Sequence, residues 1–365
     1  MKLTIQREAL LKPLQAVIGV VERRQTMPIL SNVLVGLQNG RLALTGTDLE
    51  VELVAWVEGV DGDLEDVTIQ GRKLLDICRA LPDGAEIKLS REGERVVLKS
   101  GRSRFVLSTL PAAEFPAIDV VQVPQEVRLP SLEMRHLLEK THFSMAHQDV
   151  RYYLNGLLLE RGDAYLRAVA TDGHRLAKSD VAIEGLEGGN QQVIVPRKGV
   201  LELQRLLAEE GDITLRFGTN HLQADLGHVR FTSKLIDGRF PDYTRVIPKG
   251  YPGSMIADRT ALREAFGRAA ILSNEKYRGV RLEVEPGKAV IQAHNPEQEE
   301  AEEELEIQYS GSTVEIGFNV NYLLEALGAV ESEQVEIALN DGNSSCLIQE
   351  PGKDRSQFVV MPMRL

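Results

Sequence analysis

The chain has 365 residues, of which 43 % are apolar, 26 % charged and 5 % aromatic. This composition is typical of a globular protein, and it excludes the disordered, collagen-like and disulfide-rich classes. No run of eighteen apolar residues and no secretory leader is recognisable, so we expect a cytoplasmic protein without a membrane span. The two cysteines, Cys78 and Cys346, are expected to be free thiols.

The first third of the chain alternates strand patterns with two helix patterns. A strand is predicted at residues 2–6, followed by a helix whose apolar face carries Leu10, Leu14 and Val17. Pro13 lies inside that helix and is expected to kink or loosen one turn. Alternating runs at 41–45 and 51–57 predict antiparallel hairpins, a second helix follows at 72–79, and a strand meander ends the unit.

The same order of elements recurs with a period near 124 residues. Phe115-Pro116 and Phe240-Pro241 stand 125 residues apart, and Thr47-Asp48 is echoed by Thr171-Asp172 and by His294-Asn295. This period is the length of a domain rather than of a solenoid repeat. We therefore predict an α+β fold with three copies of one domain, each with two helices on antiparallel sheet, at residues 1–124, 125–252 and 253–365.

Charge differs between the three copies. The formal net charge is −12, and the last copy carries 10 basic and 20 acidic residues, whereas the middle copy carries 17 of each. Basic side chains such as Lys73, Arg79, Lys198 and Arg205 recur on the polar face of the second helix in the first two copies, although helix 319–329 has none. A solvated helix face is one interpretation, and a surface that attracts phosphates is the other.

Residues 297–306 hold seven glutamates, which predicts a flexible acidic loop. The basic counterpart, Arg102 to Arg104, lies in the first copy. Opposite charges at opposite ends of one chain would permit head-to-tail association, which can close into a ring.

The sequence Thr171-Asp172-Gly173-His174-Arg175 resembles a catalytic cluster, but no nucleophile elbow accompanies it. An esterase built on Asp172 and His174 is therefore a disfavoured alternative. No metal-ligand spacing and no phosphate-binding glycine loop is present, so no catalytic residue, metal or cofactor is predicted. The apolar C-terminus, 358–365, predicts a core strand or an adaptable peptide-binding surface.

Longer motifs resemble the bacterial DNA polymerase III beta subunit family, the sliding clamps. They lie at residues 28–32, 45–50, 100–105, 143–156, 170–177, 195–199, 237–243, 270–279, 295–303 and 361–365, and so are spread over the whole chain. The resemblance implies a DNA-clamp fold that dimerises head to tail into a six-domain ring. It also implies a non-catalytic processivity factor in DNA replication, part of the DNA-directed DNA polymerase III holoenzyme. Twelve helices about 9 Å apart would enclose a hole of roughly 25 Å, wide enough for duplex DNA.

The resemblance also implies roles for individual residues. DNA contact is implied for Arg24, Lys73, Arg79, Gln148, Tyr152, Tyr153, Arg197 and Lys198. A cleft for short peptide motifs of partner proteins is implied for Leu154, Thr171, Gly173, His174, Arg175, Leu176, Pro241, Arg245, Val246, Ser345, Val359, Val360, Met361, Pro362, Met363 and Arg364. The dimer interface is implied for Arg102, Arg104, Phe105, Leu107, Ile271, Leu272, Glu299, Glu300 and Glu303. From sequence alone, Tyr152 and Tyr153 could equally be half-buried strand aromatics.

The implied partners are duplex DNA without sequence specificity and a second copy of the chain. Through the cleft, the resemblance adds the replicative polymerase alpha subunit, the clamp-loader delta subunit, translesion polymerases, mismatch-repair proteins and ligase; no membrane partner is expected. The alternative function is a peptide-binding scaffold that does not encircle DNA.

Overall fold

The computed structural model describes residues 2–21, 27–38, 41–118, 125–184, 186 and 189–364. The first third forms β1 Lys2–Gln6, α1 Arg7–Val17, β2 Asn32–Gln38, β3 Arg41–Thr47, β4 Val51–Trp56, β5 Asp61–Gly62, β6 Val67–Gln70, α2 Gly71–Ala80, β7 Glu86–Glu92, β8 Arg95–Ser100 and β9 Ser103–Ser108. The middle third forms β10 Gln125–Pro130, α3 Ser131–Thr141, β11 Gly156–Arg161, β12 Tyr165–Thr171, β13 Arg175–Ala182, β14 Gln191–Pro196, α4 Arg197–Leu206, β15 Asp212–Phe217, β16 His221–Asp225 and β17 Val229–Lys234. The last third forms β18 Gly253–Asp258, α5 Arg259–Ala269, β19 Gly279–Glu285, β20 Lys288–His294, β21 Glu300–Glu306, β22 Val314–Asn319, α6 Val320–Ala329, β23 Gln334–Leu339, β24 Cys346–Gln349 and β25 Ser356–Val360.

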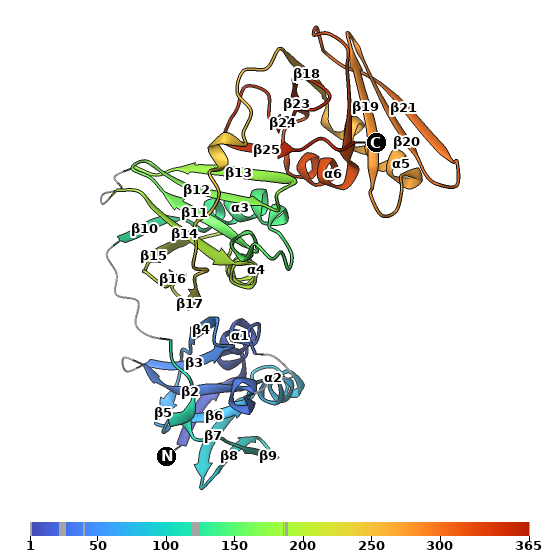
Figure 1. Cartoon of the computed structure of the whole chain (residues 1–365). Helices are drawn as coiled ribbons and strands as arrows, with labels where there is room; N and C mark the ends of the chain where they lie inside the picture. The colour runs from blue at the N-terminus through green and yellow to red at the C-terminus, as the bar shows by residue number, and fades with distance from the viewer. Residues whose placement is uncertain are drawn as a thin grey trace. The chain divides into compact units, whose positions relative to one another are not determined.

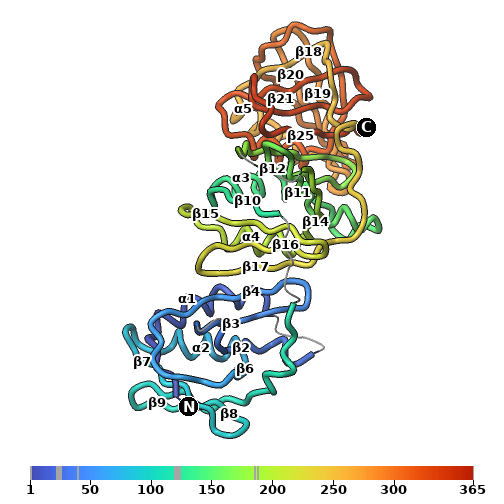
Figure 2. Tube along the Cα trace, turned by 90° about the vertical axis from the view of Figure 1, so that its left-hand side faces the viewer, coloured from blue at the N-terminus to red at the C-terminus, as the bar shows by residue number. Residues whose placement is uncertain are grey.

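Each third therefore repeats one order of elements, with two helices among antiparallel strands (Figure 1). Figure 2 follows the same trace from another side, in which the three thirds can be told apart by colour. Within the described ranges they are accompanied by six short 3-10 helices: η1 Pro28–Ser31, η2 Ala112–Glu114, η3 His142–Ser144, η4 Tyr152–Leu154, η5 Tyr243–Arg245 and η6 Ala270–Leu272. The predicted α+β triplication is confirmed, whereas the exact domain boundaries remain predictions, and residues 119–124 around the first lie outside the described part.

The helices follow the expected amphipathic pattern. In α1, Leu10, Leu14 and Val17 are buried, and the helix continues through Pro13. Asp258 caps the start of α5: its carboxylate accepts a hydrogen bond from the Ala261 amide at 2.7 Å. Asn319 caps α6 by accepting from the Asn321 amide at 2.9 Å. Such caps satisfy backbone amides that have no partner within the helix. None of the helices in the described residues combines the length and the apolarity needed to span a bilayer.

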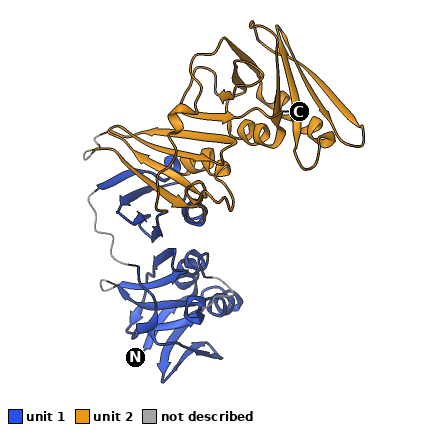
Figure 3. Cartoon of the chain, in the orientation of Figure 1, with its two compact units in different colours: residues 1–134, 198–235 blue, residues 135–197, 236–365 orange. Residues whose placement is uncertain are grey.

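Two eight-stranded sheets each combine strands from two copies of the repeat. One has the order β10-β15-β16-β17-β4-β3-β2-β6, and the other has the order β14-β11-β12-β13-β25-β24-β23-β18. In the first, β17 pairs with β4 of the preceding copy; in the second, β25 pairs with β13 in the same antiparallel manner. The chain accordingly divides into two compact units, residues 1–134 with 198–235 and residues 135–197 with 236–365 (Figure 3).

The two smaller sheets end in open strands. The terminal strands are β5 and β9 in the five-stranded sheet and β21 and β22 in the four-stranded sheet. β21 is the segment predicted to be a flexible acidic loop, and that prediction is wrong. Its residues pair with β20 along their whole length, and Ala301, Glu303 and Leu305 are half-buried on one face. Every second side chain of β21 faces α5, because side chains alternate between the two faces of a strand. This packing stabilises the strand in spite of its many glutamates.

Both cysteines are buried and free, as predicted. Burial raises the pKa of the Cys78 thiol to about 11 and that of the Cys346 thiol to about 12. Cys346 lies in the apolar core of the last third, beside Phe358 and Val360.

Candidate functional site

The turn between β12 and β13 is held by its own side chains. The Thr171 hydroxyl donates to the Arg175 carbonyl oxygen at 2.6 Å and accepts from the Gly173 amide at 3.1 Å. The Asp172 carboxylate accepts from the amides of His174 and Arg175 at 2.9 and 3.1 Å. Gly173 has φ +88°, a conformation that favours glycine. The Asp172 carboxylate thus serves the turn rather than a catalytic pair with His174.

Arg175 attaches this turn to the last third of the chain. Its guanidinium donates to Asp172 at 3.1 Å, to the Phe143 carbonyl oxygen at 2.7 Å and to Glu325 of α6. It also lies over the Tyr322 ring, 4.5 Å from the centroid. The side chain is only 12 % exposed, and its guanidinium donates its hydrogen bonds to groups of the protein itself. Arg175 therefore positions one wall of the site.

The opposite wall is the segment that includes η5, and a network of buried and half-buried polar side chains holds this segment in place. The Tyr243 hydroxyl donates to Glu160 at 2.9 Å and accepts from Arg167 at 2.8 Å. Arg167 in turn makes two bonds to Asp180, at 2.6 and 2.8 Å. Burial raises the pKa of Tyr243 to about 12; burial opposes the charge of Arg167, but its bonds to Asp180 and Tyr243 raise its pKa overall. The network fixes the backbone next to Pro241 and Val246.

Between these walls lies a cavity of about 160 Å³. Eight of the residues predicted for the peptide cleft line it: Leu154, Thr171, Gly173, Arg175, Pro241, Val246, Val359 and Met361. Arg151 and Tyr153 also line it. Arg151 lies within the motif at 143–156, but its exposed position in a loop does not by itself indicate a place in a cavity, and for Tyr153 the resemblance implies DNA contact instead.

The remaining residues predicted for the cleft lie near this cavity or elsewhere. Leu176 is buried in the core cluster beneath it, and Val360 points from the other face of β25 into a different core cluster, because strand side chains alternate. Met363 and Arg364 line a separate cavity with Tyr277 and Asn274. The others do not line the cavity, and they are His174, Arg245, Ser345 and Pro362.

The basic residues predicted to contact DNA differ in their surroundings. Lys73 and Arg79 are exposed on α2, and Arg197 is half-buried at the start of α4. Lys198 has its ammonium 2.5 Å from Asp48, so part of its charge is neutralised within the protein. Arg24 lies outside the described residues.

The loop before η4 is braced by hydrogen bonds, and η4 itself presents one aromatic ring to solvent. The Asp149 amide donates to the Asn155 side chain at 2.8 Å, and the Asn155 amide group donates back to the Asp149 carbonyl oxygen at 2.9 Å. The Arg151 side chain holds the pKa of Asp149 down at about 2. Gln148 is exposed at φ +56°, and the Tyr152 ring is 56 % exposed. Of the two adjacent tyrosines, Tyr152 is therefore the one with a ring surface open to a ligand.

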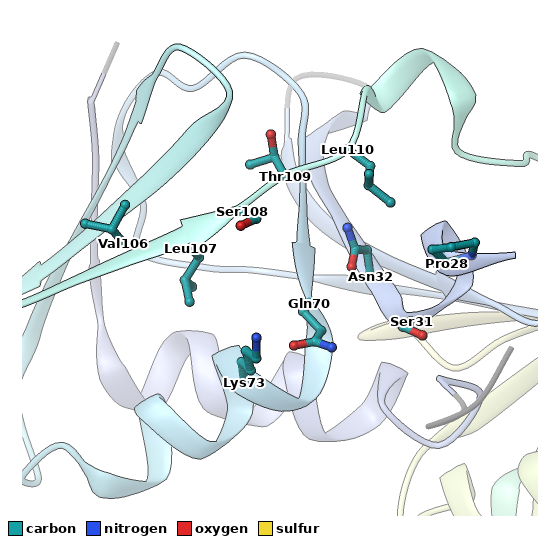
Figure 4. Close-up of a pocket in the computed structure, with 10 residues that line it drawn as sticks. All are labelled: Pro28, Ser31, Asn32, Gln70, Lys73, Val106, Leu107, Ser108, Thr109 and Leu110. Carbon is teal, nitrogen blue, oxygen red and sulfur yellow. The ribbon is translucent and has the colours of Figure 1, made fainter.

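The predicted dimer contact falls on two separate surfaces. On the first, Leu107 of β9 and Lys73 of α2 face one hollow of about 540 Å³ (Figure 4). Phe105 is half-buried, whereas Arg102 and Arg104 are exposed at the end of the open strand. Arg104 makes an ion pair of 3.6 Å with Glu92.

The second surface combines an exposed apolar side chain with carboxylates. Ile271 of η6 is 75 % exposed, and the adjacent Leu272 is half-buried. Glu300 is exposed on β21, and Glu299 accepts from the Asn295 side chain at 2.6 Å. Glu303 is engaged by Arg268 through two bonds of 2.8 Å, which lower its pKa. Among the described residues, no group of three or more His, Cys, Asp or Glu side chains is arranged to hold a metal ion.

A triplicated α+β domain with two helices per copy, sheets shared between copies and no catalytic constellation in the described residues defines the DNA-clamp class. Comparison with known protein families identifies the family of clamps to which the chain belongs. Models of the N-terminal, central and C-terminal domains of the DNA polymerase III beta subunit match residues 1–119, 128–242 and 244–364. The chain belongs to the DNA polymerase III beta subunit family, the beta sliding clamps, and it is a non-catalytic processivity factor of the replicative polymerase.

Full-length relatives support this assignment. The beta sliding clamp of Pseudomonas putida is 56 % identical and that of Escherichia coli K12 is 54 % identical, each over 100 % of both chains. The crystal structure of the DNA polymerase III subunit beta from Pseudomonas aeruginosa is 53 % identical and matches with a TM-score of 0.97 over 100 % of both chains.

Proposed function

We propose that two copies of this chain close head to tail into a ring around duplex DNA. The observation that carries this proposal is the opposite charge at two of the terminal sheet strands, β9 and β21. An open strand exposes unpaired backbone donors and acceptors, and a second chain can satisfy them. Arg102 and Arg104 adjoin one edge and Glu299, Glu300 and Glu303 adjoin the other, so the two edges are complementary in charge.

Apolar contact would support this pairing. Ile271, 75 % exposed, and Leu272 would pack against Phe105 and Leu107 of the partner copy, filling the hollow of Figure 4. Each chain offers one surface of each kind, which makes the contact heterologous, and two such contacts close a ring of two chains.

Retention of DNA in this ring is topological. Lys73, Arg79, Arg197 and Lys198, together with Arg24, would attract the phosphate backbone without reading sequence. Gln148 and Tyr152 would add contacts from the braced loop, with the Tyr152 ring available for stacking on an unpaired base. Such loose electrostatic contact permits sliding, and the closed ring prevents escape.

The cavity of unit 2 would bind the partner proteins. Its lining of Leu154, Pro241, Val246 and Met361, with arginines at its edge, suits a short peptide with aliphatic and aromatic anchors. The replicative polymerase alpha subunit, clamp-loader delta subunit, translesion polymerases, mismatch-repair proteins and ligase would compete for it. As part of the replication machinery, the protein would work in the cytoplasm.

A plasmid experiment tests encirclement. The protein is loaded on nicked circular DNA with its clamp loader, and retention is followed by gel filtration at high salt. Cutting the plasmid once should release the protein, because a ring slides off a free end. Equal retention on linear DNA would contradict encirclement and favour a scaffold that binds DNA or peptides without enclosing a duplex.

The dimer contact has its own variant. Ile271→Asp places a charge on an exposed side chain, so the fold should persist while the solution mass falls from dimer to monomer. Val150→Asp is the matched control, because Val150 is 95 % exposed and lies outside the proposed interface. A dimeric Ile271→Asp protein would show that the interface lies elsewhere.

A further inference from the structure

The β3–β4 turn in unit 1 repeats the turn that forms the cleft wall in unit 2. The Thr47 hydroxyl donates to the Val51 carbonyl oxygen at 2.9 Å and accepts from the Leu49 amide at 3.1 Å. The Asp48 carboxylate accepts from the amides of Glu50 and Val51 at 2.9 and 2.7 Å. These are the bonds made by Thr171 and Asp172, residue for residue. Leu49 has φ +78° where the unit 2 turn has Gly173 at φ +88°.

The neighbouring strand is also equivalent. The Met361 amide donates to the carbonyl oxygen of His174, the third residue after Thr171, at 3.0 Å. The Lys234 amide donates to the carbonyl oxygen of Glu50, the third residue after Thr47, at 2.8 Å. Lys234 therefore occupies in unit 1 the backbone position that Met361 occupies in unit 2.

Unit 1 has a cavity at the equivalent place. Its volume is about 170 Å³, close to the 160 Å³ of the cleft cavity. Four equivalent positions line both cavities: Thr47 and Thr171, Leu49 and Gly173, Pro116 and Pro241, and Lys234 and Met361. Two of the four pairs are conserved in type, and the other two differ in size or charge.

Both differences oppose an apolar ligand in unit 1. Met361 is an unbranched, polarisable side chain that can repack around an aliphatic or aromatic anchor. An ammonium group at Lys234 would lose water against the same anchor without gaining a partner. Gly173 has no side chain, and the guanidinium of Arg151, another residue that lines the cavity, lies 3.0 Å from the place that a Cβ would take. In unit 1 the Leu49 side chain stands at that place and lines the cavity itself.

We call the cavity beside each Thr-Asp turn a cradle, so that the chain has one cradle in unit 1 and one in unit 2. We infer that Gly173 and Met361 allow the unit 2 cradle to accept the partner motif, and that Leu49 and Lys234 close the unit 1 cradle to it. This inference rests on the proposed peptide-binding function of the cleft. It predicts one peptide per chain in the wild-type protein, although the backbone provides two cradles.

The test uses a fluorescein-labelled decapeptide that carries two leucines and one phenylalanine among polar residues. Fluorescence polarisation gives affinity, and titration above the Kd gives stoichiometry. Met361→Lys should weaken binding at least tenfold, and it should fold because Met361 is 40 % exposed. Leu49→Gly with Lys234→Met should raise the stoichiometry from one to two peptides per chain, and the added site should survive Met361→Lys. Lys353→Met, at an exposed lysine away from both cradles, should change neither quantity.

The alternative results are decisive. Two peptides bound to the wild-type chain, or an affinity within twofold of wild type for Met361→Lys, would overturn the inference while leaving the cleft intact. A folded Leu49→Gly, Lys234→Met protein that still binds one peptide would overturn it as well. A wild-type protein that binds no peptide would overturn the cleft function itself, and the inference with it.

Discussion

Replacing Arg175 by methionine should loosen the attachment between the β12–β13 turn and α6 while keeping the apolar stem of the side chain. The variant loses the bonds to Asp172 and to the Phe143 carbonyl oxygen, and it loses the contact with the Tyr322 ring. Glu325 is 46 % exposed, so its pair with Arg175 is screened by water and contributes about 0–1 kcal/mol.

The expected cost follows from these contacts. Each hydrogen bond that involves a charged group contributes about 1.5–3 kcal/mol, and a cation over an aromatic ring adds about 0.5–1 kcal/mol. Because contacts of one side chain are not additive, we expect a loss of about 3–4 kcal/mol, within the range for removing one partner of a buried pair. At about 1.4 kcal/mol per factor of ten, local opening should become at least a hundredfold more frequent.

Hydrogen exchange measured by mass spectrometry checks this expectation. Exchange should accelerate in peptides that cover His142–Ser144 and Val320–Ala329, while the unfolding midpoint reported by Trp56 fluorescence stays unchanged. Trp56 is the only tryptophan of the chain and belongs to unit 1. Arg245→Ala is the control, because Arg245 is 85 % exposed and its ion pair is with nearby Asp242. Unchanged exchange in Arg175→Met, or an equal effect of Arg245→Ala, would refute the assignment of Arg175 as an anchor.

Three further predictions concern other groups. Tyr243→Phe keeps the ring in the core but removes the hydroxyl between Glu160 and Arg167, so we expect a loss of about 1 kcal/mol by denaturant unfolding and peptide affinity lower by a few-fold, with Tyr152→Phe as a nearly neutral control. The pKa of Asp149 is depressed to about 2, so its pairing with Arg151 persists at neutral pH and is lost as the pH falls from about 4 towards 2; carboxyl NMR titration should show this, and Arg151→Gln should return the pKa towards 3.8. Burial raises the thiol pKa values of Cys78 and Cys346, so iodoacetamide at pH 8 should leave both unmodified in the native protein and label both in denaturant, as read by intact mass; rapid native labelling would contradict their burial.

Periodicity and internal repetition were enough to predict the architecture. The buried stripe of α1 and the recurring Thr-Asp turns follow from local sequence, because a helix face and a side-chain-bonded turn depend on residues close in the chain. Pairings between copies, such as β17 with β4, were beyond prediction, since two apolar strands far apart in sequence carry no local signal of their register. The glutamate-rich β21 was missed because charge outweighed its weak alternation, and the Arg268 pair that supports Glu303 is 35 positions away.

The candidate sites show the same division. The Pro241 and Met361 positions of the cleft were predicted through family motifs, and the structure brings them to one cavity. The contribution of Arg167 and Glu160 could not be predicted, because their bond to Tyr243 joins residues 76 and 83 positions apart. Val359 and Val360 belong to different core clusters, and a motif that lists both residues does not indicate this alternation along the strand.

The sharing of sheets between copies limits how this protein can be cut into pieces. A fragment that begins at residue 253 would contain β25 without its partner strand β13. The backbone donors and acceptors of β25, beside Phe358 and Val360, would then be unpaired and could bind another fragment. A single copy of the repeat is therefore not a fragment that can be cut out with all of its strands paired. Because β17 pairs with β4 and β25 pairs with β13, each copy completes a sheet of its neighbour.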